Sequence, residues 1–93
     1  MTKPTFCIGY GIAQIGFANG YRVDIMNLDD SACNKAKNPF ELLTLSASYD
    51  VEVSVFKGAK LVTKEVFPVA DGAYLPNVTA NELPAILTKV QGL

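Results

Sequence analysis

The sequence predicts one α+β domain in the order ββαββα, with a four-stranded, mainly antiparallel sheet and both helices on one face. Two segments place turn residues between apolar residues that alternate with a period of two, which is typical of hairpins. Each is followed by a segment with helix-start residues and apolar spacings of three and four. The length of 93 residues leaves room for a single domain.

The first hairpin, at about residues 6–27, depends on the register around its turn. A three-residue loop at 18–20 pairs Ile15 with Val23, so that apolar side chains share one face. A two-residue loop would mix apolar and charged side chains on the same face. We therefore expect a bulge at Gly20, with this glycine in the left-handed conformation.

The alternation reverses upstream of this hairpin. Apolar residues occupy even positions up to Ile12 and odd positions from Ala13, and Gly9 and Gly11 stand at the change. A change of phase indicates a bend or bulge. The first arm is therefore either one long, kinked strand or two short strands.

A helix at about 39–48 and a second hairpin at about 51–67 follow. Asn and Pro at the start of the helix are typical N-terminal residues. In the hairpin, Gly58 predicts a type II′ turn, and the return strand at 61–67 would pair Val51 with Val66. A connecting loop of roughly a dozen residues comes next, as its Pro, Gly and Asn content indicates.

The last element is a helix at about 82–91. We expect Asn81 to be its N-cap, because the alternative capping box between Thr79 and Glu82 would place Pro84 deeper in the helix. Its apolar side chains have helical spacing and belong to the core: Leu83, Ile86, Leu87 and Val90.

Composition excludes several classes of function. The net charge of -1 gives little electrostatic affinity for nucleic acid, and the absence of His removes the commonest general base and metal ligand. We therefore expect no enzyme activity, no cofactor and no metal. Cys7 and Cys33 are expected to be buried free thiols in the cytoplasm, a Cys7–Cys33 bridge being the alternative. The uncharged run 4–21 contains proline and four glycines, which argues against a membrane span.

Two ligand-binding alternatives have specific motifs. Gly9-Tyr10-Gly11 resembles part of a dinucleotide-binding turn, which would require a helix at 12–19, whereas a hairpin requires an extended chain there. A single-stranded nucleic-acid site would use lysines and aromatic side chains. Its candidates are Lys57, Lys60, Lys64, Arg22, Tyr10, Tyr21, Phe17 and Phe56.

Without a catalytic constellation, the chain is expected to be a non-catalytic protein-binding module that also self-associates as a homo-oligomer. Small inhibitors and adaptors of the type carried by phages and mobile elements are the analogy; a structural subunit of a virion or filament is the alternative. The uncharged first arm is the segment expected to need cover from another chain. The contact candidates are aromatic or cationic residues at turns, strand ends or loops: Tyr10, Tyr21, Arg22, Phe56, Lys57, Lys60 and Tyr74.

Overall fold

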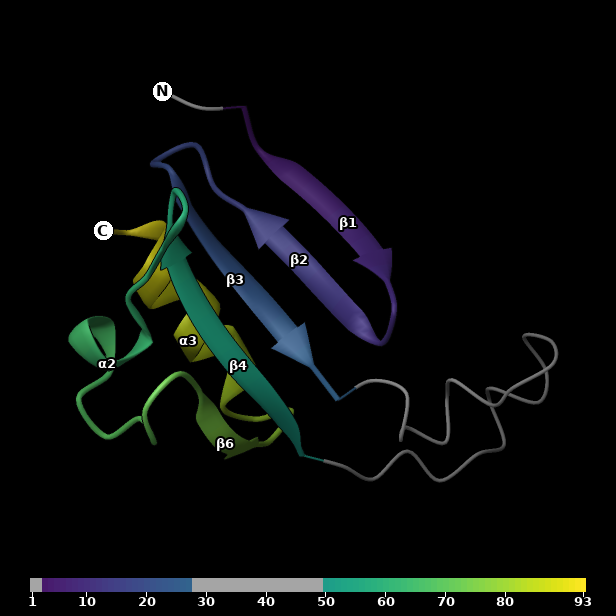
Figure 1. Ribbon diagram of the computed structural model, residues 1–93, viewed down its shortest axis with the longest axis vertical. Coiled ribbons are helices and arrows are strands. Elements are labelled where there is room, and N and C mark those ends of the chain that lie inside the picture. The colour runs from purple at the N-terminus through teal and green to yellow at the C-terminus, as the bar shows by residue number, and fades with distance from the viewer. Residues whose placement is uncertain (1–2, 28–49) are drawn as a thin grey trace, which may run out of the picture.

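The computed structural model describes residues 3–27 and 50–93, which form an α+β domain with one antiparallel sheet (Figure 1). The described strands run in the order β1-β2-β3-β4-β5, and β6 also pairs with β4. The predicted class is confirmed, but the predicted number of four strands is wrong, since the sheet has six. The elements are β1 (Thr5–Gly9), β2 (Ile12–Gly16), β3 (Tyr21–Met26), β4 (Val51–Lys57), β5 (Lys60–Leu61), α2 (Thr63–Val66), β6 (Leu75–Val78) and α3 (Leu83–Gln91).

The first arm consists of two short strands. β1 and β2 are joined by a tight turn in which Tyr10 and Gly11 both have positive φ, 53° and 72°. This is the backbone of a type I′ hairpin turn, whose twist matches that of the flanking strands. Because β2 is extended, the helix that a dinucleotide-binding turn would require at 12–19 is ruled out.

The predicted register of the next hairpin is confirmed. Ile15 pairs with Val23 across β2 and β3. Gly20 has a φ of +88°, the left-handed conformation that a bulge at this position needs. Local turn chemistry and side-chain alternation are therefore sufficient to fix this part of the sheet.

The return strand of the second hairpin is much shorter than predicted. The register is right at the turn, where Phe56 pairs with Leu61, and Gly58 has the expected positive φ of 59°. Beyond Leu61 the chain forms α2, so the predicted strand 61–67 is wrong. The cause is Thr63, a fully buried residue whose Oγ1 accepts a hydrogen bond from the Val55 amide at 2.8 Å. A side-chain oxygen thus replaces the backbone carbonyl of a continuing strand.

The position left open beside β4 is filled by β6. Val51 pairs with Val78 of this strand, not with Val66 as the sequence analysis predicted. β6 lies within the predicted connecting loop, where Pro76 and Asn77 obscured it. Proline is tolerated here because β6 is an edge strand, where a missing amide need not break a ladder.

α3 forms close to the predicted range, but its start differs from the prediction. Asn81 is not the N-cap; Glu82 occupies that position. The Glu82 carboxylate accepts hydrogen bonds from the Thr79 amide at 3.0 Å and from the Thr79 hydroxyl at 2.9 Å. Residues 79–82 form a turn before the helix, so Pro84 stays in the first helical turn, where its missing amide does no harm.

Asn19 ties the β2–β3 turn to the end of α3. Its side-chain amide donates to the carbonyl oxygens of Val90 at 2.9 Å, and of Gln91 and Leu93 at 3.2 Å. Its Oδ1 accepts from the Tyr21 amide at 3.0 Å. The last carbonyls of a helix lack intrahelical donors, and this side chain supplies them.

The core lies between the sheet and α3, which lies across one face behind β3 and β4 (Figure 1). α2, which the sequence did not predict, follows β5 at the β4 side of the sheet. The predicted helix at 39–48 lies outside the described residues. The fully buried side chains are Val23, Val53, Val55, Thr63 and Val90.

Candidate functional site

Five of the seven predicted contact residues lie at one end of the sheet, where β3 begins and β4 ends. Tyr21 pairs with Lys57, and Arg22 pairs with Phe56. Lys60 in β5 is opposite Lys57. The two hairpin turns that suggested these residues separately are therefore neighbours in space.

These five residues point to two different faces. Successive side chains of a strand alternate, so Tyr21 and Lys57 share the face of α3, and Arg22 and Phe56 lie on the other. The Arg22 guanidinium lies 4.4 Å from the Phe56 ring centroid, and its Nε donates to Asp24 Oδ1 at 2.8 Å. Arg22 is thus engaged within the chain, in a bidentate pair with a buried carboxylate.

The other three residues line a groove of about 530 Å³ beside α2 and the end of α3. We call it the lysine groove. None of its remaining lining residues was a predicted contact residue: Val62, Glu65, Val66, Lys89 and Leu93.

The lysine groove has an excess of positive charge over a partly apolar lining. Lys57 Nζ lies 5.4 Å from the Tyr21 ring centroid, and Lys60 Nζ lies 3.5 Å from Glu65 Oε1. The Lys60–Glu65 pair is largely exposed, so it holds neither group firmly. Lys89 Nζ donates to the Val66 carbonyl at 2.9 Å. Three side-chain ammonium groups against one side-chain carboxylate suit a ligand that carries negative charge beside an apolar group.

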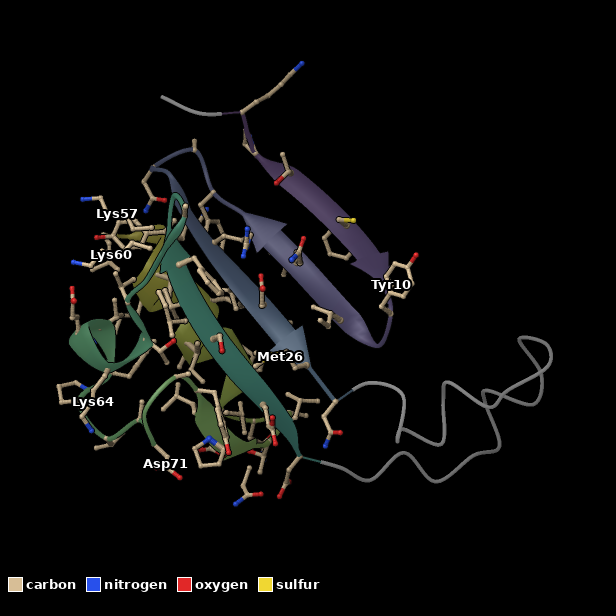
Figure 2. All side chains as sticks on the ribbon, viewed as in Figure 1. Tyr10, Met26, Lys57, Lys60, Lys64 and Asp71 are labelled. Carbon is tan, nitrogen blue, oxygen red and sulfur yellow. The ribbon has the colours of Figure 1, made fainter. Side chains whose placement is uncertain are left out.

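Tyr10 and Tyr74 are not brought to this end. Figure 2 shows Tyr10 at the β1–β2 turn, at the far end of the sheet from Lys57 and Lys60. Its side chain is fully exposed. Tyr74 precedes β6 and forms an isolated bridge with Asp71.

A second unusual surface is the outer edge of the sheet. Phe6 and Ile8 of β1 are each 67% exposed, on the face that α3 covers only farther along the sheet. Cys7 between them is an exposed free thiol, so the expectation of a buried Cys7 is wrong. Cys33 lies outside the described residues. We call Phe6, Cys7 and Ile8 the β1 edge.

Other kinds of site find little support in residues 3–27 and 50–93. There, no three His, Cys, Asp or Glu side chains gather where they could hold a metal ion. Each helix in these ranges is too short or too polar to span a bilayer. Comparisons with protein-family models, curated proteins and solved structures gave no match.

Proposed function

We propose that this protein is a non-catalytic protein-binding module that binds an acidic segment of a partner protein in the lysine groove. The observation that carries the proposal is the groove itself, in which Lys57, Lys60 and Lys89 surround an apolar lining. Small domains that inhibit or recruit other proteins act through such surface contacts, without chemistry of their own.

The groove offers two complementary kinds of contact. Lys60 is only loosely paired, and the Lys57 and Lys89 ammonium groups each have three N–H donors, more than their contacts with Tyr21 and the Val66 carbonyl use, so all three can attract carboxylates and speed the encounter with an acidic partner. Val66 and Leu93 supply apolar surface for a neighbouring side chain. A peptide with an apolar residue flanked by Asp or Glu matches this pattern.

Single-stranded nucleic acid is less well supported as a ligand, because the aromatic rings near the lysines are already in use. Lys57 lies over the Tyr21 ring, and Arg22 lies over the Phe56 ring. Lys64 donates to the Ala70 carbonyl at 3.1 Å and does not line the groove. Stacking of bases would have to displace these contacts.

Selection of random phage-displayed peptides on the immobilised protein tests the proposal. The enriched peptides should place Asp or Glu beside an apolar residue, and the double variant Lys57→Glu/Lys60→Glu should weaken their binding by about tenfold or more. Lys3→Glu/Lys64→Glu, which reverses two exposed lysines outside the groove, is the charge-matched control and should bind as the native chain does.

Two outcomes would overturn the proposal. One is selection of peptides without acidic residues. The other is equal binding by the double variant, provided that its circular dichroism and melting temperature show that it is folded.

A further inference from the structure

We infer that the β1 edge is a homodimer interface, in which β1 pairs with β1 of a second copy, antiparallel and centred on Cys7. The two sheets would then form one continuous sheet across a two-fold axis. This inference concerns a different surface from the lysine groove and does not depend on it.

The two edges of the sheet differ in their protection against pairing. The β5–β6 edge is interrupted: β5 has two residues and carries Lys60, and β6 contains Pro76 and the left-handed Asn77, with a φ of 53°. Short strands, lysine and proline are the usual means of blocking edge pairing. β1 has five residues, no charge and no proline, and its register with β2 is regular from end to end. Of the two sheet edges in residues 3–27 and 50–93, the β1 edge is therefore the one that lacks these protections against pairing.

Hydrogen-bond alternation selects the register of that pairing. The two-residue β1–β2 turn makes Gly9 and Ile12 a hydrogen-bonded pair. The backbone groups of Gly9, Cys7 and Thr5 therefore point toward β2, and those of Phe6 and Ile8 point outward. Antiparallel pairing requires outward groups to meet outward groups.

The register centred on Cys7 satisfies this requirement fully. It places Phe6 of each copy opposite Ile8 of the other, so both outward-facing residues of each strand form complete pairs. A shift by two positions would place Ile8 opposite Pro4, which has no amide, or Phe6 opposite Tyr10, which lies in the turn. A shift by one position would bring inward and outward groups together.

The side chains favour the same register. Phe6 and Ile8 meet on the α3 face of the sheet, beyond the part that α3 covers, so exposed apolar side chains cover each other across the axis. No charged side chain opposes a like charge, because β1 is uncharged and Lys3 falls opposite Gly11. The interface is short, so the dimer should be in rapid equilibrium with the monomer.

The test combines sedimentation with cross-linking. Sedimentation velocity of the full chain over about 1 µM to 1 mM should show a monomer–dimer equilibrium. In the Cys33→Ser variant Cys7 is the only thiol, and the centred register makes it a non-hydrogen-bonded pair with itself. Such pairs have Cα atoms about 4.5 Å apart, within the range that a disulfide spans. Diamide, which takes up the two electrons and two protons that the thiol pair loses, should then yield a covalent dimer.

Cys7→Lys is the decisive variant, because only self-pairing in this register brings the two new lysines together. It should remain monomeric at all these concentrations, whereas Val69→Lys, which adds the same charge at another exposed apolar residue, should dimerise as the native chain does. A monomer at 1 mM, a dimer that survives Cys7→Lys, or a dimer that diamide does not cross-link would overturn the inference. Peptide binding by the lysine groove is measured separately, so failure of one proposal leaves the other standing.

Discussion

Replacing Thr63 by Val tests the hydrogen-bond arrangement that ends β5. The Thr63 hydroxyl accepts from the Val55 amide at 2.8 Å and donates to the Ala73 carbonyl at 2.8 Å, and the residue is fully buried. Ser54 Oγ donates to the same Ala73 carbonyl at 2.9 Å. Valine keeps the branched shape of threonine and replaces the hydroxyl by a methyl group.

The structure sets the size of the effect. Thr63→Val leaves the Val55 amide buried without a partner, which costs about 1–3 kcal/mol, while the Ala73 carbonyl keeps its bond to Ser54. Ser54→Ala alone should cost about 0.5–1.5 kcal/mol, since Thr63 still serves that carbonyl. The double variant leaves the carbonyl with neither donor, so its cost should exceed the sum of the single costs by about 1 kcal/mol.

Urea denaturation of the four proteins at neutral pH measures this double-mutant cycle. For a domain of this size, each 1 kcal/mol also lowers the melting temperature by about 4–8 °C. Strictly additive losses would contradict a shared acceptor at Ala73. A Thr63→Val variant as stable as the native chain would contradict the role of the hydroxyl at Val55.

Three further effects follow from single contacts. Asn19→Asp keeps the acceptor for the Tyr21 amide but loses both side-chain N–H donors to the end of α3 and adds a negative charge there. It should lower the unfolding free energy by about 1–2 kcal/mol in urea titrations. Equal stability would contradict the role of Asn19 in holding the β2–β3 turn to α3. Gly20→Ala, at a φ of +88°, should cost about 1–2 kcal/mol by the same assay, whereas Gly9→Ala, in open space at ordinary φ, should cost nothing or stabilise. The pKa of Glu82 lies below its ordinary value, because its carboxylate accepts from the backbone amide and then the hydroxyl of Thr79. The stability that the Glu82–Thr79 contacts contribute should therefore persist at neutral pH and be lost as pH drops through that lowered pKa. In Thr79→Ala, an NMR titration should show the Glu82 pKa rise part of the way to its ordinary value. An unchanged pKa would contradict the contribution of the Thr79 hydroxyl.

The sequence predicts those parts of the sheet that depend on local interactions. The register around Gly20 follows from a turn and alternating side chains within a few residues. The end of β5 cannot be predicted in this way, because Thr63 ends the strand through hydrogen bonds to Val55 and Ala73, which tertiary folding brings to it. The same holds for β6, which is recognisable as a strand once β4 has an open position beside it.

In the candidate site too, the contacts set by local interactions were predictable and those set by tertiary packing were not. Turn chemistry pointed to Tyr21 and Lys57, which pair directly. Lys89 joins them from α3, and that meeting depends on how the helix packs against the sheet. Arg22 was expected to be available to a partner, yet its bond to Asp24 was within reach of sequence reasoning, since residues two apart share a face of a strand.

The pairing of Met26 with Glu52 has a consequence for how this chain can vary. The positions at which the chain leaves β3 and enters β4 are therefore neighbours in the sheet. The entropy of closing such a connection changes by only about 0.6 kcal/mol for each doubling or halving of its length. Because the Met26–Glu52 pairing holds the two ends of the connection side by side, the cost of closing it depends only weakly on how many residues it contains.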